Sequence, residues 1–137
     1  MRHFRPLVLG LVLLTLVTPL KAEIVMYCVA ELATGFALEN GKWKQASFKR
    51  PRYTIKFDEY YTELDGLTAA PWKCGKTYDT GLPNMLVCQN QFSKSKAFAL
   101  MQNSGRFIHA NTGGYGYISS RTDPDTDALI VGTCTKF

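Results

Sequence analysis

The sequence is poor in the residues that most catalytic and metal sites use. Its 137 residues include two histidines, His3 and His109, and four cysteines with no C-x-x-C pair. Zinc sites are commonly built from such cysteine pairs or from several histidines, so we expect no metal and no cofactor. An enzyme would have to use His109 as its base with a carboxylate such as Asp123, and no nucleophile-elbow pattern surrounds Ser104. The sequence therefore predicts no catalytic residues and a protein that is not an enzyme.

No apolar run is long enough to cross a membrane as a helix, which takes about 20 residues. The Leu7–Val17 stretch is shorter, follows Arg2 and Arg5, and precedes Thr18–Ala22, a pattern typical of a secretory signal peptide. We expect residues 1–22 to be cleaved and residues 23–137 to form a single domain. The expected location is periplasmic or secreted, with no stable membrane insertion after cleavage.

Net charge is also small once the signal peptide is set aside. The whole chain has a formal charge of +5, but three of its 16 basic residues, Arg2, Arg5 and Lys21, lie in that segment. The remainder carries 13 basic and 11 acidic side chains, a net charge of about +2. Nucleic-acid binding needs a stronger basic character, so we expect no nucleic-acid partner.

Four cysteines in an exported chain indicate disulfides, and four cysteines allow three connectivities. We favour Cys74–Cys88 as a local link and Cys28–Cys134 as a link between the first and last strands, and sequence alone does not choose among the three. A lipid anchor at Cys28 is not expected, because Val25–Tyr27 lacks the small residues of a lipobox.

The first half of the domain alternates apolar and polar residues as strands do. A first strand is predicted at Ile24–Glu31, ending at Thr34-Gly35. Asn40-Gly41 predicts a two-residue hairpin turn within Phe36–Gln45, with Leu38 opposite Trp43 and Phe36 on the same apolar face. Tyr53–Phe57 predicts a strand whose Tyr53, Ile55 and Phe57 face inward, and Asp58–Pro71 an irregular excursion.

The second half continues the same pattern, and no long helical period interrupts it. We expect strands at Met85–Gln89, Tyr115–Ser119 and Leu129–Lys136, and a hairpin of Ala97–Gln102 and Arg106–Ala110 around Asn103–Gly105. The fold class is therefore all-β: a small antiparallel meander, barrel or sandwich of roughly eight strands held by two disulfides.

Two motifs resemble ligand-binding loops, but each lacks a glycine that such a loop requires. Asp123, Asp125 and Asp127 begin like a calcium loop, but Ala128 stands where that loop needs glycine, so an acidic turn is the better interpretation. Gly75-Lys76-Thr77 resembles the end of a phosphate-binding loop whose upstream glycine is replaced by Ala70.

A binding surface is the remaining functional possibility. Basic residues gather between Lys42 and Lys56, and exposed loops offer tyrosines and a Ser-Gly-Arg turn. The candidate binding residues are Lys42, Lys44, Lys49, Arg50, Arg52, Ser104, Gly105, Arg106, Tyr115 and Tyr117. The partner is unknown; an envelope component or another protein would fit such a surface.

Several of these motifs together resemble a family of small exported bacterial proteins of uncharacterised function. The likeness is carried by Tyr27-Cys28, Gly35…Trp43…Phe48, Arg106-Phe107…Gly114-Tyr115 and Val131–Cys134, and it implies no activity. A weaker resemblance is to the periplasmic C-type lysozyme inhibitors, whose Ser-Gly-x-x-Tyr signature is echoed by Ser104–Phe107 with the aromatic residue one place early. We expect a non-catalytic binding protein; the alternatives are a lysozyme-inhibitor-like protein and a barrel that holds a small ligand in an apolar cavity.

Overall fold

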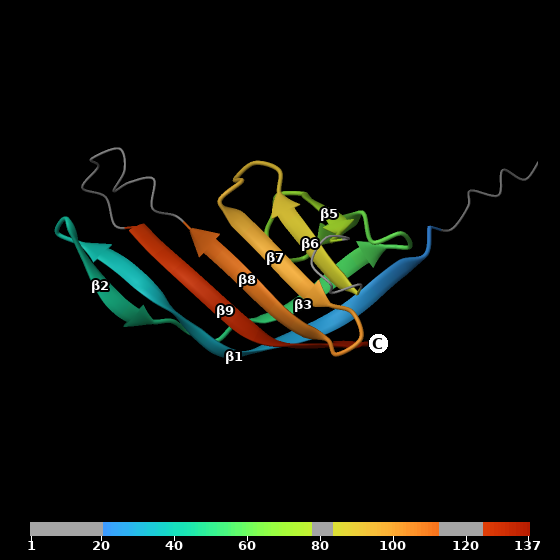
Figure 1. Cartoon of the computed structure of the whole chain (residues 1–137), viewed down its shortest axis with the longest axis horizontal. Helices are drawn as coiled ribbons and strands as arrows, with labels where there is room; N and C mark the ends of the chain where they lie inside the picture. The colour runs from blue at the N-terminus through green and yellow to red at the C-terminus, as the bar shows by residue number, and fades with distance from the viewer. Residues whose placement is uncertain (1–20, 78–83, 113–124) are drawn as a thin grey trace, which may run out of the picture.

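The computed structural model describes residues 21–77, 84–112 and 125–137, and these residues form nine antiparallel strands and no helix. The strands are β1 (Glu23–Glu39), β2 (Lys42–Ser47), β3 (Arg52–Asp58), β4 (Glu63–Asp65), β5 (Trp72–Lys76), β6 (Met85–Asn90), β7 (Lys96–Met101), β8 (Arg106–Thr112) and β9 (Asp125–Lys136). Sheet order β1-β3-β4-β5-β6-β7-β8-β9 is closed by β9 pairing with β1, and β2 lies beside the second half of β1 (Figure 1). The expected all-β fold is confirmed as an eight-stranded barrel with one extra strand.

Strand β1 is longer than the sequence predicted. It runs through the expected break at Thr34-Gly35 and pairs with β3 over residues 23–29, with β2 over 34–39 and with β9 over 26–38. The strand has glycine at position 35 because the backbone of β9 comes very close there. A Cβ on Gly35 would lie 1.9 Å from the carbonyl oxygen of Asp127. The glycine therefore marks a close contact between strands and not the end of one.

A β-bulge interrupts the pairing of β1 with β9. Ala30 lies opposite Gly132 and Leu32 opposite Val131, so Glu31 is the extra residue. Because side chains alternate between the two faces of a strand, one inserted residue reverses which positions face inward. Met26, Cys28 and Ala30 are buried before the bulge, whereas Leu32 after it is 56% exposed and Ala33 is buried.

The barrel interior is filled by large apolar side chains and by both disulfides. The largest fully buried apolar side chains come from β3 to β7: Trp72, Phe57, Phe98, Ile55, Leu64, Leu86 and Leu100. Cys28 pairs with Cys134 (the terminal disulfide) and Cys74 with Cys88 (the local disulfide), which confirms the favoured connectivity. In both links the two cysteines are directly opposite in the strand register.

The local predictions have mixed outcomes. The Asn40-Gly41 hairpin forms with Leu38 opposite Trp43, and both turn residues have positive φ, as such a turn requires. The predicted apolar face of this hairpin is only partly buried, since Leu38 is 3% and Phe36 is 53% exposed. The β1–β2 hairpin extends beyond the barrel (Figure 1, left).

Two segments predicted to be irregular contain strands. Within Asp58–Pro71, Glu63–Asp65 forms β4, which pairs with β3 and β5 through Leu64. The pattern was too short to identify because Leu64 is its one buried residue. The last part of the predicted turn Asp123–Asp127 belongs to β9, which begins at Asp125. The expected strand Tyr115–Ser119 lies outside the described residues.

Candidate binding face

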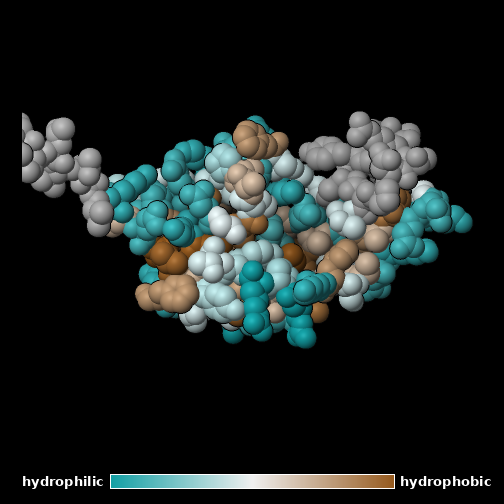
Figure 2. Space-filling view, turned by 180° about the vertical axis from the view of Figure 1, so that it is seen from behind, coloured by the Kyte–Doolittle hydropathy of each residue, from teal (hydrophilic) through white to brown (hydrophobic). Residues whose placement is uncertain are grey.

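The outer surface of the barrel is divided into a charged part and an apolar part. On β3, β4 and β5 the outward positions include Lys56, Glu63 and Lys73, and Lys73 forms an ion pair with Glu63. On β1, β8 and β9 the outward positions include Leu32, Ile108 and Leu129, which are 56%, 49% and 47% exposed. From the side opposite to Figure 1, hydrophilic side chains gather at the right end and at the middle of the lower edge, and apolar side chains show between them (Figure 2).

The strand register aligns the apolar side chains in a continuous row across four strands. Leu32 on β1 is opposite Val131 on β9, Val131 is opposite Ile108 on β8, and Ile108 is opposite Ala99 on β7. Directly opposite residues on antiparallel strands share one face of the sheet. We call this outward surface of β7, β8, β9 and β1 the apolar face. Large exposed apolar surfaces of this kind are typical of interaction sites.

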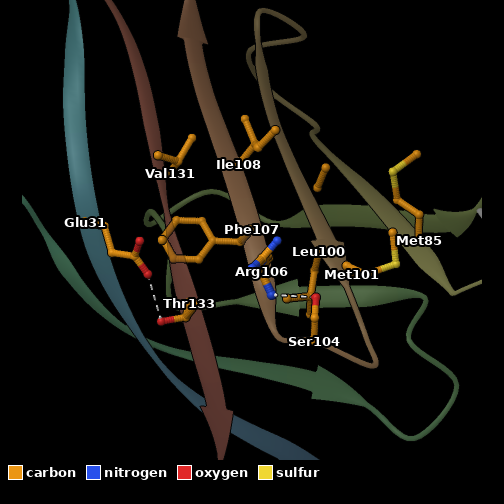
Figure 3. A pocket seen from close by; sticks show the side chains of 12 residues that line it. Glu31, Met85, Leu100, Met101, Ser104, Arg106, Phe107, Ile108, Val131 and Thr133 are labelled. Atoms are coloured by element: carbon orange, nitrogen blue, oxygen red, sulfur yellow. Dashed lines mark hydrogen bonds between the residues drawn. The ribbon is translucent and has the colours of Figure 1, made fainter.

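A groove of about 600 Å³ runs along the apolar face beside the β7–β8 turn (Figure 3). Its floor is apolar and includes Ala99, Ile108 and Val131, and methionines from β6 and β7 form one side. The small side chain of Ala99 between larger neighbours leaves the surface hollow. Its volume falls in the range of about 300–1,000 Å³ that is typical of ligand pockets.

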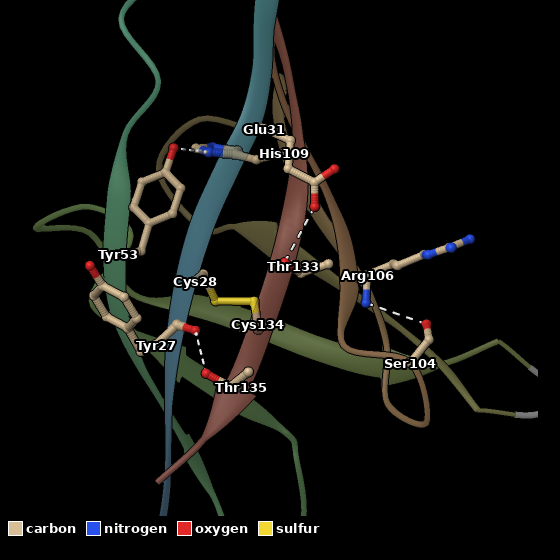
Figure 4. Close-up of a disulfide and its surroundings, with 10 residues drawn as sticks. All are labelled: Tyr27, Cys28, Glu31, Tyr53, Ser104, Arg106, His109, Thr133, Cys134 and Thr135. Carbon is tan, nitrogen blue, oxygen red and sulfur yellow. Dashed lines mark hydrogen bonds between the residues drawn. A yellow bond between two sulfur atoms is a disulfide. The ribbon is translucent and has the colours of Figure 1, made fainter.

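One end of the groove is polar. Glu31, Thr133, Arg106 and Ser104 line this end, and the Thr133 hydroxyl donates a hydrogen bond to the Glu31 carboxylate at 3.3 Å (Figures 3 and 4). The bulge is the reason that Glu31 reaches this position, since it is the residue without a partner on β9. The groove therefore combines an apolar floor with a polar, charged end.

Two further arginines lie near this polar end. Arg50 donates a hydrogen bond to the main-chain carbonyl of Glu31 at 3.3 Å. Arg52 on β3 is opposite Val29, Val29 is opposite Thr133, and Thr133 is opposite Arg106. This part of the sheet therefore carries three arginines and one acidic residue, Glu31, which favours a net positive charge at this end of the apolar face.

The β7–β8 turn that carries Ser104 is fixed to β9 through Gly105. The Gly105 amide donates to Met101, and its carbonyl accepts from the Cys134 amide at 2.7 Å. Gly105 has φ of +70°, and a Cβ on it would lie 2.2 Å from the carbonyl oxygen of Cys134. Because Cys134 belongs to the terminal disulfide, that disulfide holds the turn as well as the two chain ends (Figure 4).

Inside the barrel, His109 forms a second polar feature. Its Nδ1 lies 3.1 Å from the Tyr53 hydroxyl, and its ring packs against Trp72 and Phe98. Burial lowers the pKa of His109 to about 4, with the charge of Lys96 acting in the same direction, and burial raises the pKa of Tyr53 to about 12. Both groups are therefore neutral near pH 7, and His109 is 6% exposed.

The structure does not place His109 beside an acid that would make it a base. Its hydrogen-bond partner among the described residues is Tyr53, and Asp123 lies outside them. In the same described part of the chain, no group of three histidine, cysteine or acidic residues is arranged to hold a metal ion.

The predicted binding residues divide into separate groups. Lys42 and Lys44 are opposite Glu39 and Ala37, which places them on the face of the sheet opposite to Phe36 and Arg52. Lys44 also forms an ion pair with Glu39 at 2.8 Å and holds the pKa of that carboxyl below its usual range. The basic residues therefore do not make one surface, and of those predicted only Arg106 lines the groove.

The other predicted positions have clear locations. Ser104 and Arg106 are exposed at the end of the groove and Gly105 is buried beneath them, whereas Lys49 is exposed in the β2–β3 connection. Tyr115 and Tyr117 lie outside the described residues.

Sequence reasoning missed Glu31, Leu32, Ala99, Ile108 and Val131. The sequence did contain a signal for Val131, because Leu129, Ile130 and Val131 are consecutive apolar residues. Such a run makes a strand apolar on both faces, which is typical of strands whose two faces are both in contact with other groups. No comparable signal marked Glu31, because a bulge depends on the register with a strand about a hundred residues away.

Comparison with known proteins identifies no relative: no protein-family model, no curated protein and no solved structure matches the chain. Within the part of the chain that the structure describes, no helix has the length and apolar character needed to cross a membrane.

Proposed function

We propose that this protein is an exported, non-catalytic binding domain that acts in the periplasm or outside the cell and uses the apolar face as its contact surface. The observation that carries the proposal is the groove, where Ile108 and Val131 form an exposed apolar floor next to a charged end. Two disulfides suit an oxidising compartment, and the N-terminal segment has the pattern of an export signal.

Exposed apolar side chains support a contact role because leaving them in water is unfavourable. Burial of apolar surface contributes about 25 cal/mol per Å², so covering Leu32, Ile108 and Leu129 would supply much of the free energy of binding. The scaffold is rigid at this place, since the groove lies on strands that are paired on both sides. A rigid surface loses little conformational entropy when a partner binds.

Capture from an envelope extract tests the proposal. The protein, purified after export, is coupled to a resin and compared with Ile108→Asp in the groove and with Phe92→Asp as a matched control. Phe92 is 82% exposed and lies in the β6–β7 connection, away from the groove. We expect a bound component to be retained by the unchanged protein and by Phe92→Asp and to be lost with Ile108→Asp. Equal capture by all three proteins would contradict the proposal.

A lysozyme-inhibitor-like function is the second candidate. Ser104 and Arg106 are exposed at a turn beside the groove, as an inhibitory loop requires, and the place of the signature tyrosine is held by Ile108, which is also exposed. Phe107 is 2% exposed and stacks on Phe98, so this aromatic side chain is unable to enter an enzyme cleft. Inhibition of a C-type lysozyme by the protein, abolished by Arg106→Glu, would favour this candidate; full lysozyme activity at excess protein would exclude it.

A further inference from the structure

We propose that the groove on the apolar face binds an anionic amphiphile, a molecule with one hydrocarbon chain and a negatively charged head group. This inference rests on the proposed binding function and names the chemical class of its ligand. The hydrocarbon chain lies along the floor formed by Ala99, Ile108 and Val131, and the head group binds at Arg106 and Ser104.

The charge distribution supports an anionic head group. Arg106 lines the polar end of the groove. Arg50 donates a hydrogen bond to the main chain of Glu31, and Arg52 lies in the same strand row as Arg106, with Val29 and Thr133 between them. A guanidinium group binds phosphate or carboxylate through two parallel hydrogen bonds, which a neutral head group cannot match. Glu31 supplies the opposing charge, and its carboxylate is directed toward Thr133.

The floor of the groove supports a flexible hydrocarbon chain. Beyond the polar end, the row Leu32, Val131, Ile108 and Ala99 carries no charged or hydrogen-bonding side chain across four strands. Met85 and Met101 line one side, and methionine side chains adapt easily to ligands of irregular shape. A linear apolar chain therefore finds a surface that it can cover along its length.

Strand pairing argues against a peptide that adds to the sheet. Each of β7, β8 and β9 is hydrogen-bonded to a neighbour on both sides, so the groove has no free strand edge for main-chain hydrogen bonds. Recognition must come from side chains, and the groove offers apolar side chains along its floor and a polar end that includes the Arg106 guanidinium. A ligand that offers an apolar chain and one anionic group uses both.

Calorimetric titration of the exported, purified protein tests the inference. The probes are dodecyl phosphate, dodecyl maltoside and dodecyltrimethylammonium, each below its micelle concentration, so that the chain is constant and the head group is anionic, neutral or cationic. We expect dodecyl phosphate to bind about tenfold or more tightly than the other two, since a charge-assisted pair is worth about 1.5–3 kcal/mol, or more than tenfold. Absence of dodecyl phosphate binding, or equal binding of all three probes, would overturn the inference.

Variants separate the two parts of the groove. Arg106→Gln should weaken dodecyl phosphate by about tenfold and leave dodecyl maltoside unchanged, whereas Ile108→Asp should weaken both. Lys94→Gln and Phe92→Asp, at exposed positions of the β6–β7 connection, are the matched controls and should bind as the unchanged protein does. If Arg106→Gln binds all three probes normally, the head group is not recognised at this end.

Two more measurements keep the outcomes distinct. Amide chemical-shift changes in the unchanged protein should follow β7, β8 and β9 on addition of dodecyl phosphate, which tests the site even if a variant fails to fold; changes confined to other strands would refute it. If the unchanged protein has twice the monomer mass in solution and Ile108→Asp has the monomer mass, the apolar face binds a second copy of the chain and the amphiphile proposal is refuted. Envelope capture that depends on Ile108, without dodecyl phosphate binding, would refute the amphiphile and leave the binding function standing.

Discussion

Acidification should destabilise this protein through His109. The imidazole is buried among Trp72, Phe98 and Tyr53, its Nε2 has no hydrogen-bond partner in the part of the chain that the structure describes, and burial lowers its pKa to about 4. An unfolded chain would protonate the same histidine with a pKa near 6.5. Because the folded pKa is the lower one, its contribution to stability is fully present above pH 6.5 and is lost as the pH falls from 6.5 to 4.

The size of the effect follows from these two pKa values. Between pH 7 and pH 5 the unfolded state gains most of one proton that the folded state does not bind, which costs about 2 kcal/mol of unfolding free energy. For a urea slope of about 1–2 kcal/mol per M this moves the unfolding midpoint down by roughly 1–2 M. The two histidines of the chain are His3 and His109, so in protein prepared without residues 1–22 His109 is the one histidine that titrates in this window.

Urea unfolding at pH 7, 6 and 5, with both disulfides intact, measures this change. His109→Gln serves as the comparison, because glutamine keeps a polar group near Tyr53 but does not titrate. We expect the variant to be less stable at pH 7 and to lose almost none of its remaining stability between pH 7 and pH 5. If the unchanged protein and His109→Gln show the same dependence on pH, His109 is not held neutral by burial and this reasoning is refuted.

Three further predictions concern the scaffold. Replacing both cysteines of the terminal disulfide by alanine should cost about 5 kcal/mol, against about 3 kcal/mol for the local one, because the loops closed are about 106 and 14 residues long; thermal unfolding of the two variants tests the order. Gly105→Ala should be strongly destabilising because its Cβ would meet the Cys134 carbonyl, whereas Gly41→Ala, with open space around it, should cost only about 1 kcal/mol; equal losses in denaturant unfolding would contradict this. Phe107→Ala should cost about 3–5 kcal/mol in the same assay, and a cost below about 1 kcal/mol would show that Phe107 is not buried.

Local patterns predicted the fold class well because they depend on neighbouring residues. The Asn40-Gly41 turn and the alternation of Tyr53, Ile55 and Phe57 are determined by a few adjacent residues, and all formed as expected. Both inferences needed only strand periodicity and turn chemistry. The favoured disulfide pairing also formed, although the sequence alone had left three connectivities open.

The candidate site was harder to predict because it depends on contacts between distant segments. Glu31 reaches the groove only because the register of β1 against β9 leaves it unpaired, and Gly35 appears in sequence as a strand break because its close contact with Asp127 is not visible there. Ile108 seemed an ordinary strand residue, since the apolar face exists only once β7, β8, β9 and β1 lie side by side. The groove is a property of the sheet and not of any single segment.

The pairing of β1 with β9 also bears on the order in which the barrel folds. The register joins residues about a hundred positions apart in the sequence, from Met26 opposite Lys136 to Leu38 opposite Asp125. Pairings of such long sequence separation must close a large loop before they stabilise the fold, which makes them slow to form. We therefore expect barrel closure to be a late folding step, and until it occurs the inner side of β1 is uncovered and Cys28 has no partner sulfur beside it.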